Sequence, residues 1–264
     1  MTELQLTDRA ILAAILAGEA IMKVYSSADF KVRLKKDNTP VTTADFEAQK
    51  IILKTLEITG LPVLSEEQMS ASYSERKNWE LFWMIDPLDG TKEFIKRNGE
   101  FTVNIALVKK NSPVAGVIYA PATGELYAAV IESGAWKICN PEKDCNFQAI
   151  QKSGVKLPLK EKTDQFTIAV SRSHLNRETE AFIEKLKGEK GQVILEKLGS
   201  SLKTCRIAEG TADIYPRFGT TMEWDTAAGQ AIAKAAGKNI FLIDLNTELM
   251  YNKEKLQNPD FTVL

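Results

Sequence analysis

The strongest constraint in this sequence is an apolar run that ends directly in two acids and a turn, the segment LFWMIDPLDGT at residues 81–91. Five consecutive apolar residues of this kind predict a buried strand. Asp86 and Asp89 follow the run and offer the hard oxygen atoms that Mg²⁺ prefers. The segment therefore predicts a strand that ends in an acidic cation site.

The residues around these acids favour a phosphate site as well. Pro87 stiffens the turn, so we expect the carbonyl group of Leu88 to point inward beside the acids. Gly90 and Thr91 can present backbone N–H groups at the start of a helix, where an anion binds favourably. Magnesium-dependent phosphate chemistry is therefore the first functional hypothesis.

Charge and length exclude several other classes of protein. The 264 residues carry a formal net charge of -1 and include no strongly basic region, so neither long nucleic acid nor an anionic membrane is an expected partner. Residues 11–25 are apolar on one side only and predict an amphipathic helix, neither a signal peptide nor a membrane span. No lipidation signal supports association with the inner membrane. A small-molecule partner and a cytoplasmic location are expected.

Three cysteines, Cys139, Cys145 and Cys205, lack the spacing of zinc sites, and their odd number argues against a complete disulfide framework. None is followed six positions later by arginine, the spacing of cysteine-dependent phosphatases. We interpret all three as structural, which agrees with a reducing compartment.

Patterns along the chain predict an N-terminal α+β part, residues 1–160. Two long helical patterns occupy residues 7–60, the second beginning at Thr42 or Thr43 and ending at Gly60. Strand-like runs follow at residues 62–64, 81–85, 102–108, 114–119 and 125–131. Short turns join the last three runs, which predicts an antiparallel meander. The polar stretch 139–165 is expected to be a linker or a peripheral hairpin.

The remainder, residues 161–264, predicts an α/β part. Strand-like runs at 166–170, 193–198, 212–215 and 240–243 alternate with helical runs at 177–186, 201–209 and 226–236. The fold class is therefore α/β, with the active site expected between the two parts.

Four further acids, Asp45, Glu66, Glu67 and Asp225, lie at the boundaries of predicted elements, where a second set of cation ligands is expected. Each also has an ordinary structural interpretation. Asp45 has capping-box spacing from Thr42, Asp225 can be the N-cap of a helix that starts at Thr226, and the two glutamates can be solvated loop acids. Residue chemistry alone leaves both interpretations open, and it does not choose between Glu66 and Glu67.

A haloacid-dehalogenase-type phosphatase is a minority alternative within phosphate chemistry. Its signature places two aspartates two positions apart after a strand, so that both face the same side. Asp86 and Asp89 are three positions apart, which breaks that register. The signature also normally lies near the start of the chain.

Taken together, the motifs resemble the inositol monophosphatase-like phosphatases, which are magnesium-dependent and lithium-sensitive. The resemblance covers nearly the full length and rests on VTTAD at 41–45, LSEE at 64–67, DPLDGT at 86–91 and EWDTAAG at 223–229. Within that family the chain is most similar to the bacterial 3'(2'),5'-bisphosphate nucleotidases of sulfur assimilation. That similarity rests on residues 91–108, SRSH at 171–174, GSSLK at 199–203 and YPRFG at 215–219.

The resemblance implies a layered αβαβα sugar-phosphatase fold and a site for two or three Mg²⁺ ions. It favours Glu66 over Glu67, and its implied metal ligands are Glu66, Asp86, Asp89, Asp225 and the Leu88 carbonyl. The implied catalytic residues are Asp45, Thr91 and Glu66, with Asp45 and Thr91 activating the attacking water.

The resemblance also implies substrate contacts at Glu66, Leu88, Asp89, Gly90, Thr91, His174, Ser200, Lys203, Arg217 and Asp225. Three of these have plain alternatives, because Lys203 can be a solvated helix residue, Ser200 a helix cap and Arg217 a surface charge. His174 is the only histidine, and a surface or packing role is its alternative.

The implied reaction is hydrolysis of 3'-phosphoadenosine 5'-phosphate to AMP and phosphate, with the 5'-phosphosulfate relative as a second substrate. An inositol monophosphatase, a fructose-1,6-bisphosphatase and a non-catalytic nucleotide-binding module are the alternatives. The sequence does not decide whether the protein is a monomer or a homodimer.

Overall fold

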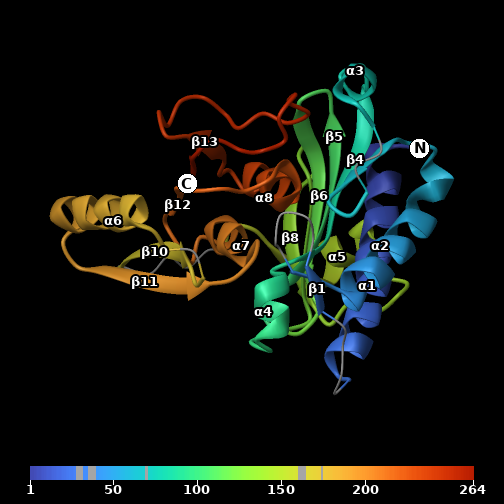
Figure 1. Ribbon diagram of the computed structural model, residues 1–264, viewed down its shortest axis with the longest axis horizontal. Coiled ribbons are helices and arrows are strands. Elements are labelled where there is room, and N and C mark those ends of the chain that lie inside the picture. The colour runs from blue at the N-terminus through green and yellow to red at the C-terminus, as the bar shows by residue number, and fades with distance from the viewer. Residues whose placement is uncertain (28–31, 35–39, 69–70, 160–164, 174) are drawn as a thin grey trace.

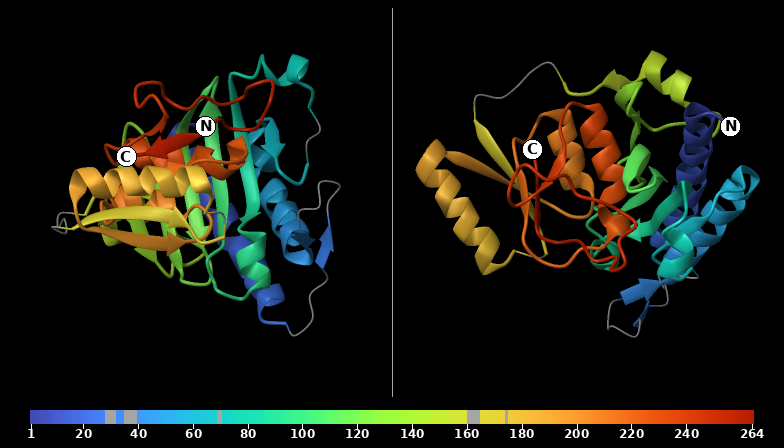
Figure 2. Two further views of the ribbon diagram at one scale, coloured as in Figure 1. Left: turned by 60° about the vertical axis from the view of Figure 1, so that its left-hand side comes forward. Right: turned by 90° about the horizontal axis from the view of Figure 1, so that it is seen from above.

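The protein is layered, with helices and sheets alternating from one side to the other (Figures 1 and 2). Its structure is a computed structural model, which describes residues 1–27, 32–34, 40–68, 71–159, 165–173 and 175–264. Helices α1 (Glu3–Tyr25) and α2 (Thr43–Leu56) form the first layer, on one face of a large sheet. Helices α7 (Leu202–Glu209) and α8 (Glu223–Ala235) lie on its other side, followed by smaller sheets and α6 (Arg177–Lys190). The predicted αβαβα layering is confirmed.

Within the described residues, seven strands form the large sheet, in the order β3-β4-β5-β6-β7-β8-β9. They are β3 (Val63–Ser65), β4 (Leu81–Asp89), β5 (Thr102–Lys109), β6 (Ser112–Ala120), β7 (Glu125–Val130), β8 (Gly134–Cys139) and β9 (Val155–Lys156). β3 and β4 are parallel, and every later neighbouring pair is antiparallel. The predicted meander of β5, β6 and β7 is therefore confirmed.

The continuous apolar run of β4 reflects burial on both faces of this strand. Trp83 and Ile85 belong to the core beneath α1 and α2, whereas Phe82 and Met84 belong to the core beneath α8. A half-exposed strand would alternate apolar and polar residues, so the unbroken run marks a strand between two helical layers.

The first helical layer approaches the sheet closely because small residues line its inner face. Ala10, Ala13, Ala14 and Ala17 of α1 are buried. A Cβ atom on Gly18 would lie 2.4 Å from the ring of Tyr119 on β6, so this close approach requires glycine. As predicted, the second helix begins beside Thr42, and the short 3₁₀ helix η1 (Glu57–Thr59) after it ends at Gly60.

The stretch 139–165 contributes to the core, so its interpretation as a linker or peripheral hairpin is wrong for the described part. It contains α5 (Phe147–Ser153) and β9, and the side chains of Phe147 and Ile150 are buried in the core beneath α1. Two apolar residues three positions apart in a polar stretch gave too weak a helical pattern to predict this packing.

The described residues of the C-terminal part form two small sheets. β10 (Phe166–Ser171) and β11 (Val193–Leu198) pair in parallel, with α6 between them in sequence. β14 (Phe261–Val263) lies between β12 (Tyr215–Arg217) and β13 (Ile240–Leu242) and is antiparallel to both. The sequence did not predict β14, and β12 occupies residues 215–217, not 212–215.

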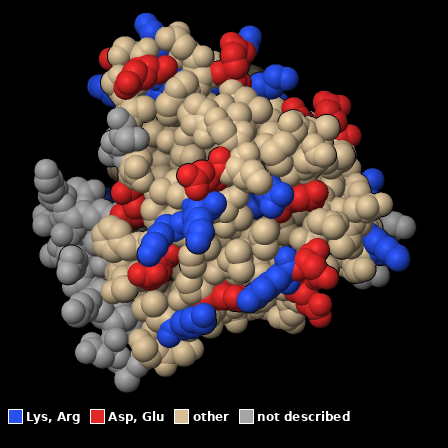
Figure 3. Space-filling model, turned by 90° about the vertical axis from the view of Figure 1, so that its right-hand side faces the viewer, with Lys and Arg blue, Asp and Glu red and all other residues tan. Residues whose placement is uncertain are grey.

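The remaining elements are short: β1 (Val32–Leu34), β2 (Pro40–Thr42), α3 (Tyr73–Arg76) and α4 (Thr91–Ile95). None of the helices within the described ranges has the length and hydropathy needed to cross a membrane. On the face formed by α1 and α2, acidic and basic side chains alternate over the residues drawn in colour, without a large area of one sign (Figure 3).

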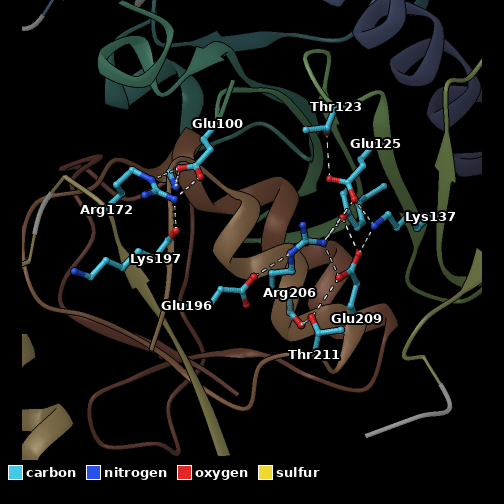
Figure 4. A network of polar contacts seen from close by, with 12 residues as sticks. Glu100, Thr123, Glu125, Lys137, Arg172, Glu196, Lys197, Arg206, Glu209 and Thr211 are labelled. Atoms are coloured by element: carbon cyan, nitrogen blue, oxygen red, sulfur yellow. Dashed lines mark hydrogen bonds and ion pairs between the residues drawn. The ribbon is translucent and has the colours of Figure 1, made fainter. Parts of the chain in front are cut away.

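A largely buried polar network ties α7 to the large sheet (Figure 4). Arg206 and Glu209 of α7 form an ion pair of 2.8 Å, and Glu209 also contacts Lys137 of β8 at 2.7 Å. Lys137 is paired in turn with Glu125 of β7, and Glu209 accepts a hydrogen bond from Tyr127. These contacts fix the position of α7, the helix whose N-terminal turn borders the cavity described next.

Candidate active site

A cavity of about 240 Å³ lies where the end of β4 meets the N-terminal turns of α7 and α8. Three acids of its lining, Glu66, Asp89 and Asp225, form a group that we call the acidic half, and two buried cations, Lys203 and Arg217, form a group that we call the basic half. The other lining residues are Gly90, Thr91, Lys92, Glu93, Ser171, Gly199, Ser200, Ser201, Thr204, Tyr215, Thr220, Thr221, Thr226 and Phe261. The structure thus brings together residues that are far apart in the sequence.

The spacing of Asp86 and Asp89 is explained by an irregularity in β4. Asp86 lies opposite Asn104 of β5, and Asp89 lies opposite Thr102, so three steps along β4 match two steps along β5. A bulge of this kind returns Asp89 to the face that Asp86 occupies. Both acids therefore face one site despite a spacing that would separate them in a regular strand.

The carboxylates repel one another in a buried environment. Burial raises the pKa of Asp86 well above its ordinary value, and the nearby charges of Glu66, Asp89 and Asp225 raise it further. Burial, followed by the charge of Asp89, likewise raises the pKa of Asp225. Clustered oxygen ligands with excess negative charge are the donor set that fits Mg²⁺.

Asp86, Asp89 and Asp225 are neighbours, but each accepts a hydrogen bond from a donor group of the protein. Within the described residues, no group of three or more acidic, histidine or cysteine side chains has the geometry to hold a metal ion as it stands. Asp86 accepts from the Leu88 N–H group at 3.1 Å, and Asp225 accepts from the Met222 N–H group at 2.9 Å. Asp89 accepts hydrogen bonds from the hydroxyl groups of Ser200 and Ser201.

Asp45 makes the capping contact that its spacing from Thr42 suggested, and it also contacts Thr91. Its Oδ2 atom accepts from the backbone N–H and the hydroxyl of Thr42, each at 2.7 Å, which caps α2. Its Oδ1 atom accepts from the Thr91 hydroxyl at 3.3 Å. Burial outweighs the opposing effect of the bonds from Thr42 and raises the pKa of Asp45 to about 6. One carboxylate thus joins the helix cap to the turn after β4.

Gly90 allows the chain to turn tightly at the edge of the cavity. Its φ of 89° is in the left-handed region, and an added Cβ atom would lie 3.0 Å from the Glu100 carbonyl oxygen and 3.2 Å from the Ser200 Cβ. Glycine is favoured on both counts. Both Gly90 and Thr91 line the cavity.

Lys203 and Arg217 are buried, so their interpretations as a solvated helix residue and a surface charge are wrong. Lys203 is 5% exposed, and its ammonium group donates to the carbonyl groups of Leu198 and Ser200. Arg217 is 9% exposed and donates to the Thr220 carbonyl, while its buried Nε atom has no hydrogen-bond partner among the described residues. Burial lowers the pKa of Lys203 to about 8, a change that the charge of Asp89 opposes and the charge of Arg217 reinforces.

Two predicted helix caps differ from the structure. Ser201, not Ser200, is the N-cap of α7, and Ser200 has a left-handed φ of 53°. α8 begins at Glu223, so Asp225 is its third residue and reaches back to the Met222 N–H group. The N-cap position holds methionine, a residue without a cap signal, which explains why the start was misplaced. His174 lies outside the described residues.

Sequence reasoning missed Thr102, Asn104 and Ser201. The Ser201 hydroxyl lies 2.9 Å from Asp89, and Asn104 and Thr102 join the same network from β5. A signal was present, because Thr102 and Asn104 are polar residues at alternate positions in an otherwise apolar strand.

Residues 3–260 match the model of the inositol monophosphatase family. The 3'(2'),5'-bisphosphate nucleotidase CysQ of Salmonella typhimurium is 44% identical over 251 residues, which cover 94% of each chain. The protein of the same name from Buchnera aphidicola is 45% identical over 239 residues, 89% of this chain and 84% of that one. The crystal structure of CysQ from Bacteroides thetaiotaomicron superposes with a TM-score of 0.92 and 48% identity, over 99% of this chain and 97% of that one.

Proposed function

This chain belongs to the inositol monophosphatase family, and we propose that it hydrolyses the 3'-phosphate of 3'-phosphoadenosine 5'-phosphate to give AMP and phosphate. The names of the relatives that match nearly its whole length, 3'(2'),5'-bisphosphate nucleotidases, support this substrate. We include 3'-phosphoadenosine 5'-phosphosulfate as a second substrate, since it differs from the first only at the 5' end.

The observation that carries the substrate assignment is the buried basic half of the cavity. A monophosphate needs only the acidic half and its cations, whereas a bisphosphate brings a second anion that must be neutralised elsewhere. Lys203 and Arg217 supply two buried cations within the same cavity, and the Nε atom of Arg217 has no partner among the described residues. A buried donor without a partner is costly, and a second phosphate would satisfy the Arg217 Nε–H group. We further propose that residues 161–264 contribute this half and residues 1–160 contribute most metal ligands.

Membership of this family implies a divalent cation, and we assign it as Mg²⁺, with two or three ions per site. Glu66, Asp86, Asp89, Asp225 and the Leu88 carbonyl would hold these ions. When bound, Mg²⁺ would neutralise charge on the phosphate and lower the pKa of an attacking water. Glu66 is preferred over Glu67 because Glu66 lines the cavity and lies close enough to Asp86 to raise its pKa.

The residues of the chain itself would handle the proton of the attacking water. The Thr91 hydroxyl already donates to Asp45 Oδ1, so it can accept a proton from water as it passes its own to that carboxylate. Asp45 is held in place by its two bonds from Thr42. Gly90 and Thr91 would hold the phosphoryl oxygens through their backbone N–H groups. The water oxygen would bond to phosphorus as the bond between phosphorus and the 3' oxygen breaks, and the leaving 3' oxygen would take a proton from solvent to become the 3' hydroxyl of AMP.

Phosphate release from three substrates tests the proposal. With Mg²⁺, we expect 3'-phosphoadenosine 5'-phosphate to be hydrolysed with the highest kcat/KM, well above inositol 1-phosphate and fructose 1,6-bisphosphate. Removing Mg²⁺ with a chelator or adding lithium should suppress the reaction. Oxygen from labelled water should appear directly in phosphate, with no aspartyl-phosphate trapped. Binding without turnover, or preference for a sugar phosphate, would contradict the proposal.

The pH dependence of KM should report the charge on Lys203. Its pKa of about 8 lies below the ordinary 10.5, so the free enzyme holds the charged form below pH 8 and loses it as pH rises through that value. The substrate phosphates are already fully ionised in this range. We expect KM for the bisphosphate to rise about 10-fold between pH 7 and pH 9.5.

Lys203→Met is the matched control for this titration. It should give a KM that is already high at pH 7 and nearly flat up to pH 9.5, because the arginine that remains does not titrate there. If the variant kept the wild-type rise in KM, another group would be responsible.

A further inference from the structure

We propose that Ser201 and Asn104 are positioning residues that hold the Asp89 carboxylate against the turn of α8 that carries Asp225. The inference deepens the proposed function, since it concerns how the same metal site is kept in register. Both residues lie in stretches that carry the family resemblance, 91–108 and 199–203, but the motifs assigned a role to neither.

The Ser201 hydroxyl touches both sides of the site. Its Oγ atom lies 2.9 Å from Asp89 Oδ2, at the end of β4, and 3.0 Å from the backbone carbonyl oxygen of Asp225, in the first turn of α8. Ser201 itself is the N-cap residue just before α7 and is 5% exposed. One buried hydroxyl thus joins three separate elements at the point where the acidic half of the cavity is assembled.

Helix capping does not account for this hydroxyl. Ser201 is the N-cap residue of α7, a position where serine usually accepts a hydrogen bond from a backbone N–H group of the first turn. Here its side chain makes no cap hydrogen bond. The hydroxyl is directed to Asp89 and Asp225 instead, at the expense of its usual structural role.

Asn104 sets the direction of that hydroxyl. Its Nδ2 atom donates to Ser201 Oγ at 2.9 Å, while its Oδ1 atom accepts from the Thr102 hydroxyl at 2.8 Å. With one lone pair of Ser201 occupied by Asn104, the Ser201 hydrogen is left for the oxygen atoms of Asp89 or Asp225. Asn104 is 1% exposed within an apolar strand, a placement that is unfavourable unless the amide is fully bonded.

The network holds only one oxygen of Asp89. The hydrogen bonds recorded for this carboxylate, from Ser200, Ser201 and Asn104, all reach Oδ2 across the described part of the chain. Oδ1 is then the oxygen left to face a cation. Partners of this kind around a ligand typically change metal affinity by about 10–100-fold when they are removed.

Direct metal titration separates positioning from catalysis. The metal-free proteins would be titrated calorimetrically with Mg²⁺, without substrate, and their thermal unfolding recorded. We expect Ser201→Ala and Asn104→Leu each to weaken Mg²⁺ binding about 10–100-fold. Asn104 reaches Asp89 itself only at 3.5 Å and Ser201 at 2.9 Å, so we expect it to act chiefly through Ser201. The Mg²⁺ affinity of the double variant should therefore be close to that of whichever single variant binds Mg²⁺ more weakly.

Asn239→Leu is the matched control, since Asn239 is a buried asparagine (7% exposed) that lies outside the cavity lining. It should leave the Mg²⁺ affinity unchanged even where it lowers Tm. Asn104→Ala replaces Asn104→Leu if the leucine is not accommodated. An affinity within twofold of wild type in both Ser201→Ala and Asn104→Leu overturns the inference, as does an equal loss in Asn239→Leu.

The outcome is distinguishable from failure of the proposed function. A wild type that binds Mg²⁺ but does not hydrolyse the bisphosphate refutes the function, while the metal affinities still decide the role of Ser201 and Asn104. A wild type that hydrolyses the bisphosphate, with variants of unchanged affinity, refutes the positioning role alone. A wild type that binds no Mg²⁺ refutes positioning as well.

Discussion

Asp89→Asn is expected to lower kcat for Mg²⁺-dependent phosphate release by about 10³-fold, corresponding to about 4 kcal/mol of lost charge stabilisation. The amide has nearly the same shape but no negative charge. It is also mismatched to its surroundings, because Asp89 Oδ2 accepts two serine hydroxyl groups at 2.7 and 2.9 Å. If the amide NH₂ group faces the serines, those hydroxyl groups lose their acceptor, and if it faces the cations, it repels them.

Initial rates with saturating 3'-phosphoadenosine 5'-phosphate, over a range of Mg²⁺ concentrations, measure the effect. Asp144→Asn is the matched control, because Asp144 is an exposed acid outside the cavity lining, and it should retain full activity. A fully active Asp89→Asn enzyme would refute the assignment of the acidic half as the metal site.

Thr91→Val is expected to lower kcat by about 10²–10³-fold, the usual range for loss of a proton relay. Valine matches threonine in shape and removes only the hydroxyl, whose contact with Asp45 at 3.3 Å would be lost. The Thr91 side chain is not an assigned metal ligand, so Mg²⁺ affinity should be retained and KM should change little. The substitution should therefore lower kcat and leave KM nearly unchanged.

Single-turnover rates and Mg²⁺ titration together test this split. Thr55→Val is the matched control, since the Thr55 hydroxyl bonds to the Ile51 carbonyl within α2, away from the cavity lining. Asp45→Asn is a less specific probe, because Asp45 also caps α2. A Thr91→Val enzyme with wild-type kcat would show that Thr91 carries no proton.

The local parts of the site were predictable from the sequence. The β4 strand, its acids and the glycine turn are contiguous, and a strand buried on both faces has a distinctive unbroken apolar pattern. The capping box of Asp45 is likewise local, with both partners within four residues. Such features depend on residues that are close in the sequence, so sequence patterns can predict them.

The parts that were missed depend on contacts between distant segments. Asn104 and Ser201 are 97 positions apart, and nothing in either segment signals their hydrogen bond. The burial of Lys203 and Arg217 arises in the same way, from packing that brings α7 and β12 to one cavity. β14 was missed because only three residues form it, and its pairing with β12 and β13 defines it as a strand.

The position of β14 between β12 and β13 imposes an order on assembly during synthesis. Both neighbours precede β14 in the chain, so a ribosome-bound chain extended only through β13 holds two strands that lack the strand between them. β12 carries Arg217, and Phe261 of β14 lines the same cavity. The basic half of the cavity is therefore completed only after β14 has emerged, when every acid of the other half has already been synthesised.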